Sequence, residues 1–206
     1  MESSTLFYFL ITSILLTLAP GPDILYLLTK SLADGAKSGI ILAAGLISGI
    51  VFHTMLVMLG VAALIQSSPL ALTLLKYFGA AYLLFLAFGA FKSSGEMKLT
   101  RADSQTSTAA IYRRGVLMNV LNPKVLLFFL AFLPQFINTS AEISVSLQII
   151  LLGLTFALQG FIIFSIVAIC AGRLRKVILK NKNLNKIFSV VEGSVLTIIA
   201  LALVFT

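Results

Sequence analysis

Residues 6–29 read LFYFLITSILLTLAPGPDILYLLT, a largely apolar stretch with two prolines around one glycine and one charged residue, Asp23, directly after them. The stretch exceeds the roughly 20 apolar residues with which an α-helix crosses about 30 Å of hydrocarbon. A proline inside a helix removes a backbone donor and crowds the carbonyl four residues earlier, so continuous helix is not expected through Pro20-Gly21-Pro22. The stretch therefore predicts a membrane-spanning helix with a break in it.

The rest of the chain is equally apolar. Of its 206 residues 59% are hydrophobic and 11% are charged, whereas soluble domains carry about 25% charged residues. Backbone in lipid must satisfy its own hydrogen bonds, and the alternation of a β-barrel is absent, so the expected fold class is an all-α integral membrane protein. Six transmembrane helices are predicted, at Leu6–Thr29, Gly39–Ile65, Leu70–Phe91, Gly115–Phe136, Ile143–Ala171 and Ile187–Phe205.

The cations predict the orientation. They lie in the connectors after the first, third and fifth segments: Lys30 and Lys37; Lys92, Lys98, Arg101, Arg113 and Arg114; and Arg173, Arg175, Lys176, Lys180, Lys182 and Lys186. Cationic loops stay cytoplasmic, so both termini are expected on the outer side.

The polar connector 92–114 divides a single transmembrane domain, residues 1–206, into halves 1–91 and 115–206 with three segments each. An odd number of spans per half inverts the second copy, so a 3+3 inverted repeat is predicted. The first segment of the second half contains Asn119-Val-Leu-Asn122-Pro123-Lys124, which places a second proline break at the position that corresponds to the first.

Asp23 and Lys124 directly follow prolines at the two breaks and are the leading site candidates. An ionisable side chain within a spanning segment is costly unless it pairs, faces water or serves transport. One interpretation is a fixed salt bridge between the two, or a charge close enough to the interface to be wetted. The other is a transport site, because broken helices direct free backbone groups and partial charges into a cavity.

An amino-acid zwitterion needs charges of both signs, which gives the functional interpretation its chemistry. Asp23 would attract the ammonium or carry a coupling proton. The carboxylate would be received by Lys124, by the amides around Gly21, which Pro20 and Pro22 flank, and by Asn119 and Asn122 beside Pro123.

Three further polar residues lie within predicted spans. His53 follows Gly45 and Gly49 at four-residue steps, so all three share one helical face. It could relay protons or be a neutral, hydrogen-bonded packing residue, and both interpretations stay open. Gln159 and Glu192 are lesser candidates, since a Gln often bridges helices and Glu192 lies near the interface.

Other classes of function have little support. The net charge of +8 is spread over the connectors rather than one soluble face, so no nucleic-acid partner is expected. Phosphate loops, HExxH, GxSxG and acidic clusters for divalent ions are absent, so neither a cofactor nor a metal is predicted. Cys170 is the single cysteine, and redox work normally needs a pair.

Two motifs in order, Ala19-Pro20-Gly21-Pro22-Asp23 and the run from Gly115 through Asn119, Asn122, Pro123 and Lys124 to Leu133-Pro134-Gln135-Phe136, closely resemble the LysE/RhtB family of amino-acid exporters. The resemblance covers the whole chain. It implies a multi-pass protein of the bacterial inner membrane that exports amino acids or close derivatives, commonly by proton antiport. One departure is Ala87, where many relatives have glycine.

The function expected is therefore secondary export of an amino acid or derivative rather than an enzymatic reaction, with a proton as coupling ion and the lipid bilayer as surroundings. A six-helix membrane redox carrier or enzyme, or a scaffold that does not transport, is the alternative. The amino acid is not predicted, and assembly into a homodimer is left open.

Overall fold

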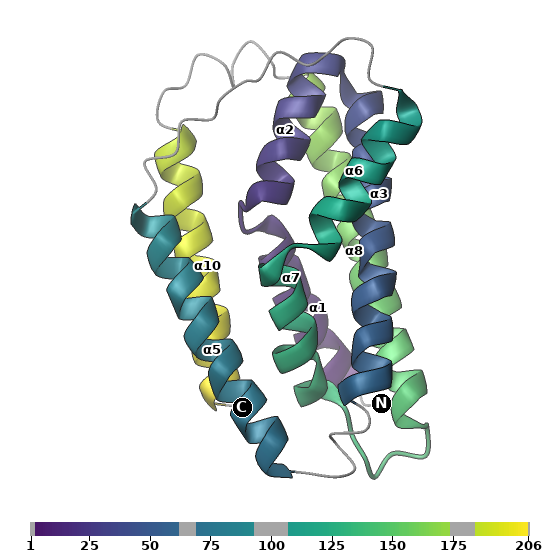
Figure 1. Cartoon of the computed structure of the whole chain (residues 1–206), viewed down its shortest axis with the longest axis vertical. Coiled ribbons are helices and arrows are strands. Elements are labelled where there is room, and N and C mark those ends of the chain that lie inside the picture. The colour runs from purple at the N-terminus through teal and green to yellow at the C-terminus, as the bar shows by residue number, and fades with distance from the viewer. Residues whose placement is uncertain (1–2, 62–68, 93–106, 174–183, 206) are drawn as a thin grey trace.

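The protein is described by a computed structural model that covers residues 3–61, 69–92, 107–173 and 184–205. Every regular element in these ranges is a helix, and the helices run roughly along one long axis (Figure 1). The prediction of an all-α fold is confirmed for these residues.

The first half begins with two helices in place of one. Helix α1 (Ser3–Leu18) and helix α2 (Pro22–Asp34) are bent by 58° relative to each other. At Gly35 the chain reverses with a φ of 87°, a conformation open to glycine because it has no Cβ. Helix α3 (Ala36–Leu56) continues into a π-helical turn, η1 (Val57–Val61), and α5 (Pro69–Lys92) completes this half.

The second half repeats the bent start. Helix α6 (Thr108–Val120) is followed by α7 (Pro123–Leu127), the π-helical η2 (Phe128–Phe132) and the 3₁₀ turn η3 (Leu133–Phe136), and the bend between Thr108–Val120 and Pro123–Phe136 is 48°. Two long helices follow, α8 (Val145–Arg173) and α10 (Leu184–Phe205).

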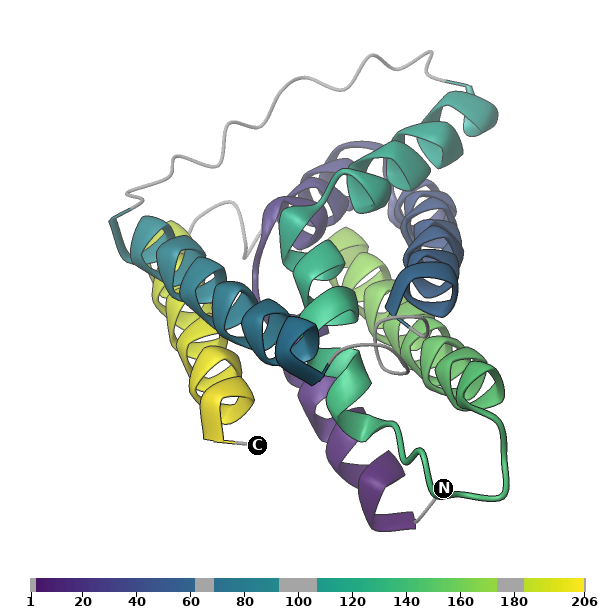
Figure 2. The same cartoon turned by 60° about the horizontal axis from the view of Figure 1, so that its bottom comes forward.

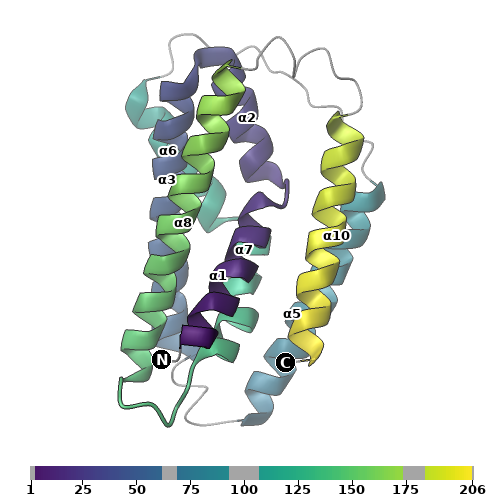
Figure 3. The same ribbon diagram turned by 180° about the vertical axis from the view of Figure 1, so that it is seen from behind.

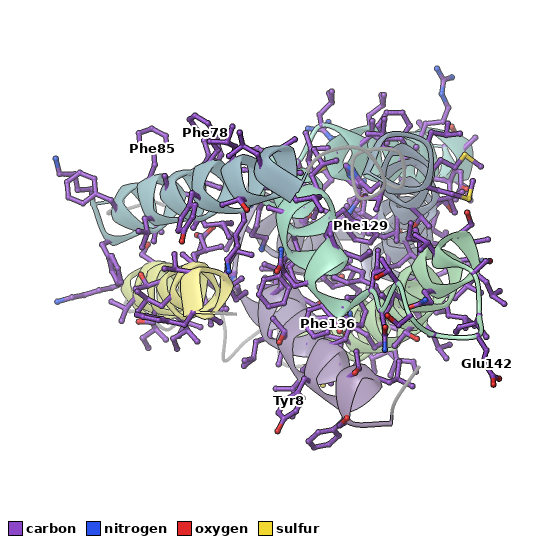
Figure 4. All side chains as sticks on the ribbon, turned by 90° about the horizontal axis from the view of Figure 1, so that it is seen from below. Tyr8, Phe78, Phe85, Phe129, Phe136 and Glu142 are labelled. Atoms are coloured by element: carbon purple, nitrogen blue, oxygen red, sulfur yellow. The ribbon has the colours of Figure 1, made fainter. Side chains whose placement is uncertain are left out.

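Four helices in the described ranges are long and apolar enough to cross a membrane, and the count rises to six if each bent pair is one span. The chain is thus a multi-pass membrane protein, and the four long helices lie at four of the six predicted places. Phe78 and Phe85 on α5 point away from the bundle and are 72% and 66% exposed, which suits contact with lipid (Figure 4).

The helices form two groups. Helices α3, α6 and α8 pack side by side with α2, and α1 packs on α8, whereas α5 pairs with α10 (Figure 2). The pair reaches the rest through α7 and η2 on one side and α1 on the other (Figure 3). A space between the groups therefore borders both breaks.

Glycines bring α3 and α6 together. A Cβ on Gly45 would collide with the carbonyl oxygen of Tyr112, and one on Gly115 would lie 2.8 Å from the Leu46 nitrogen. Gly49 faces Asn119 in the same way. The predicted face of Gly45, Gly49 and His53 is buried, as expected for small residues at a helix contact in a membrane.

The helix ends beside the three cationic connectors lie at one end of the bundle, and α1 begins and α10 ends at the other (Figure 1). One boundary differs from the predicted connector 92–114. Helix α6 already begins at Thr108, because the Ser107 hydroxyl caps it by accepting from the Ala110 N–H at 3.3 Å. Arg113 and Arg114 are thus helical, and Arg114 stacks over Tyr26 at 4.5 Å. Lys98, Arg101, Arg175, Lys176, Lys180 and Lys182 lie outside the described residues.

Candidate functional site

The first break leaves the carbonyl oxygens of Leu16 and Ala19, around the end of α1, free to accept hydrogen bonds from elsewhere. Pro20 has no N–H to bond Leu16 O, and Gly21 is extended, with φ −117° and ψ −172°, so the helical bonding pattern stops. Pro22 then opens α2, which places Asp23 in its first turn. A carboxylate is stabilised there by the positive end of the helix dipole.

The second break is organised by Asn122. Its side-chain oxygen accepts a hydrogen bond from the Lys124 N–H at 3.0 Å and so caps α7, whose first residue is Pro123. Its own N–H donates to Asn119 O at 2.9 Å. Asn122 therefore fixes the direction in which α7 leaves the break.

Two side chains from the second break reach the first. The Lys124 ammonium donates to Ala19 O at 2.9 Å and to Leu16 O at 3.4 Å, and the amide of Asn122 donates to the Asp23 carboxylate at 2.5 Å. Asp23, Asn122 and Lys124 are all at least 94% buried. Lys124 thus occupies the position that a bound cation would take on the free carbonyls of a broken helix.

The fixed salt bridge between Asp23 and Lys124 is not present in this form. Across the described residues, no carboxylate oxygen lies within 4.0 Å of the Lys124 nitrogen. The Asp23 carboxylate instead accepts a hydrogen bond from the Asn122 amide. The two charges still attract each other, so they form one electrostatic unit without a direct pair.

Two cavities border Lys124. The smaller, about 20 Å³, lies toward α3 and α8 and has Asp23, Asn119 and Lys124 among its lining residues. Such a volume holds about one water molecule. Oδ1 of Asp23 and Oδ1 of Asn119 are buried there without a hydrogen-bond partner among the described atoms.

The larger cavity, about 270 Å³, lies between the breaks and the α5–α10 pair. Its polar wall consists of Asn122, Lys124 and Glu192. The breaks add Pro22 and Pro123, and α5 adds Leu86, Gly89 and Ala90. Asp23 does not line this cavity.

Because Gly21 has no side chain, a space remains between the Lys124 ammonium and the Glu192 carboxylate. A Cβ at Gly21 would lie 3.0 Å from the Lys124 nitrogen and 3.3 Å from a Glu192 oxygen. We expect Gly21→Ala to fold, because flexible side-chain ends can shift by tenths of an ångström, but to lose most of its export. Export and thermal unfolding of the purified variant check this, and wild-type export would show that the space is not used.

His53 is completely buried and lines neither cavity. Its Nε2 lies 3.0 Å from Asn119 O, which can only accept, so Nε2 carries the proton. The centroid of the His53 ring also lies 5.7 Å from that of Phe52 and 5.8 Å from that of Phe129. The geometry favours the packing interpretation, in which His53 holds the end of α6 against α3.

We therefore expect His53→Ala to lower the free energy of unfolding by about 2 to 4 kcal/mol, through the lost hydrogen bond and the cavity left behind. The pH profile of export should keep its shape in the protein that folds. Proteoliposomes assayed at several pH values check this, and a displaced profile would restore the proton-relay interpretation.

Gln159 bridges two helices. From α8 its amide donates to the Thr17 hydroxyl of α1 at 3.0 Å and lies 3.5 Å from Ser13 O, while its Oε1 has no partner among the described atoms. It lines neither cavity. His53 and Gln159 thus lie outside both cavities, Gly21 lies in contact with the larger one, and the two linings bring together the candidate residues Pro22, Asp23, Asn119, Asn122, Pro123, Lys124 and Glu192.

The contribution of α5 was not predicted. Leu86, Gly89 and Ala90 line the larger cavity, yet they carry no charge or motif. The run of small residues Ala87, Gly89 and Ala90 was the available signal, since small side chains mark close approach or open space on a membrane helix.

The model of the LysE type translocator family matches residues 14–206. The chain belongs to this family. It is 32% identical over 185 residues to a homoserine/homoserine lactone efflux protein of Salmonella typhimurium, covering 88% of this chain and 89% of the relative. It is also 32% identical to an uncharacterized membrane protein of Vibrio cholerae, covering 79% of each chain, and 30% identical to the membrane protein YrhP of Bacillus subtilis, covering 88% and 90%.

No solved structure matches the chain. The resemblance to LysE/RhtB exporters is confirmed, and membership in a family of translocators, together with an efflux protein among the relatives, supports amino-acid efflux by this LysE family member.

Proposed function

We propose that this LysE family member is a proton-coupled antiporter that exports an amino acid or a close derivative through the site between its two breaks. The observation that carries the proposal is the meeting of the breaks: Lys124 binds the free carbonyls of α1, Asn122 binds Asp23, and a cavity of about 270 Å³ opens beside them. The Salmonella relative is named for efflux of homoserine and homoserine lactone, an amino acid and its derivative, which supports this class of substrate.

The proposed architecture is six spans in a 3+3 inverted repeat, with each bent pair as one span broken at its prolines. The contacts support it. In such a repeat α1 corresponds to α6, α3 to α8 and α5 to α10. Helix α1 packs on α8, and its counterpart α6 packs on α3. The corresponding helices α3 and α8 also contact each other, as do α5 and α10. Inverted repeats of this kind place the substrate between broken helices near the middle of the membrane.

Aromatic side chains fill the bundle on the side of the breaks where α1 begins (Figure 1). Aromatic rings from α1, η2, η3 and α8 contact one another there. Phe128 stacks on Phe132 with ring centroids 5.1 Å apart. Phe9 meets Phe136 edge to face, as Phe129 meets Phe156, with centroids 5.2 Å apart in both pairs. Phe129 and Phe136 lie within the bundle (Figure 4). An alternating-access cycle requires a path to open past these rings.

Proton coupling would use the buried carboxylates. Asp23 and Glu192 carry two negative charges against one on Lys124, and a proton or a substrate ammonium can balance the surplus. Exchange of one for the other would couple export to the proton gradient, and the membrane potential adds about 2.3 kcal/mol per charge at 100 mV.

The proposed orientation has both termini outside, since the cationic connectors should stay cytoplasmic. We expect an alkaline phosphatase fused after Thr206 to be active and a fluorescent protein fused there to be dark when exported through the same route. The reverse pattern would place the termini in the cytoplasm.

Export itself is tested with purified protein in proteoliposomes loaded with a panel of radiolabelled amino acids. The expected result is release of one or a few of them that accelerates when an inward proton gradient is imposed. Release of none of the panel above protein-free liposomes would reject amino-acid export. Release that ignores the gradient would reject proton coupling alone.

A further inference from the structure

The larger cavity offers a ligand very few hydrogen-bond donors. Pro22 and Pro123 have no N–H, and Leu86, Gly89 and Ala90 lie within a continuous helix whose amides are bonded internally. One of the two N–H groups of the Asn122 amide already donates to Asp23, and the Asn122 side-chain oxygen accepts from the Lys124 backbone N–H. Among the residues that line the cavity, the second amide N–H of Asn122 is therefore the one donor besides Lys124 that is left for a substrate carboxylate.

Lys124 is largely occupied as well. Two of its three ammonium hydrogens are directed at Ala19 O and Leu16 O, and the side chain is 6% exposed. Moving it toward a carboxylate would leave those two carbonyls without a donor in a buried site, at a cost of about 1 to 3 kcal/mol each. At most one N–H remains for a ligand.

Glu192 is the opposite case. It is half-buried on α10 and lines the cavity, and no described side chain donates a hydrogen bond to it or pairs with it within 4.0 Å. Its carboxylate is therefore an acceptor with free capacity, on the wall that faces Lys124 across the space left by Gly21.

The charges point the same way. Asp23, Glu192 and Lys124 together leave one negative charge uncompensated when all are ionised, and an uncompensated charge is expensive in a membrane interior. A ligand ammonium beside Glu192 cancels that charge. A ligand carboxylate adds another negative charge, and the one cation in the cavity lining, Lys124, is already held by Ala19 O and Leu16 O.

We infer that Glu192 recognises the primary ammonium group of the substrate and that the substrate carboxylate is dispensable, so that the substrate class is primary amines of amino-acid size, including amides and esters that lack a carboxylate. This rests on the proposed export function. Lys124 then serves as a fixed cation of the protein rather than as the partner of the carboxylate.

The test is competition against tritiated L-homoserine bound to the purified full chain in detergent, or against another amino acid if the export panel identifies one instead. The amide of that amino acid should compete within about threefold of the parent compound. The N-acetyl derivative, which keeps the carboxylate and loses the ammonium, should not compete at a 100-fold excess. Loss of one charged hydrogen bond corresponds to roughly tenfold or more in affinity.

Glu192→Gln should lower the affinity for the parent and the amide by about tenfold or more. Glu142→Gln removes an exposed carboxylate away from the cavity and should leave both affinities unchanged. Competition by the N-acetyl derivative but not the amide, or wild-type affinity in Glu192→Gln, would overturn the inference. The competition series with the amide and the N-acetyl derivative uses the wild-type protein, so it tests the inference even if Glu192→Gln does not fold. Failure of every amino acid to bind or to be exported would reject the proposed function instead.

Discussion

Export is expected to fall to background when Lys124 is replaced by glutamine, although the protein should still insert. The change removes the donor from Ala19 O and Leu16 O and leaves the carboxylates of Asp23 and Glu192 without their nearest cation. Removing one member of a buried charged group costs about 3 to 5 kcal/mol. Lys76→Gln on α5 is the control, because a surface change away from such features stays within about 0.5 kcal/mol.

Asp23→Asn should have a similar effect on export, and the double variant is informative. Because Asp23 and Lys124 act on each other, Asp23→Asn with Lys124→Gln should lower the free energy of unfolding by less than the sum of the single changes. Export should nevertheless stay at background. Thermal unfolding in detergent and export from proteoliposomes measure the two effects, and wild-type export with wild-type affinity in the double variant would remove both residues from the site.

The second large effect concerns the contact of α3 with α6. A Cβ at Gly115 would lie 2.8 Å from Leu46 N and 3.0 Å from the Cα of Gly45, and backbone cannot shift as a side-chain end can. We expect Gly115→Ala to cost about 1 to 3 kcal/mol and Gly115→Leu to prevent folding. The end of α6 carries Asn119 and the second break, so the site would be lost with this contact.

Gly60→Ala is the matched control, since a Cβ there meets nothing within 4 Å. Size-exclusion profiles and thermal unfolding of the three variants give the comparison. A stable, monodisperse Gly115→Leu protein would show that the two helices are not held this close.

The parts of the fold that local sequence determines were predictable. Apolar length placed the four long helices, and the prolines indicated where two further helices end and bend, because a missing N–H and a fixed φ act on the residues immediately around them. Helix α1 accordingly ends at Leu18, and α7 begins at Pro123. The π-helical turns η1 and η2 were not foreseen, since they depend on the packing of their side chains.

The pairing within the site could not be read from sequence. Charge and the corresponding places after the two proline breaks joined Asp23 to Lys124, but the carbonyls of Leu16 and Ala19 have no side-chain signature and lie more than 100 residues from Lys124. Asn122 was predicted as a substrate ligand, and nothing in the sequence indicated that its side chain also bonds Asp23 and the Lys124 N–H. Such choices depend on how the halves dock, which motifs do not specify.

Protection of one engineered cysteine tests most directly whether the substrate occupies the larger cavity. Gly89 lines that cavity and Gly60 does not, and a Cβ at either position meets nothing within 4 Å, so both accept a cysteine. Cys170, the single native cysteine, is first replaced by serine. A saturating concentration of the exported amino acid should slow maleimide labelling of Gly89→Cys several-fold and leave labelling of Gly60→Cys unchanged. Equal labelling of Gly89→Cys with and without that amino acid, in a variant that still exports it, would contradict the placement of the substrate beside the two breaks.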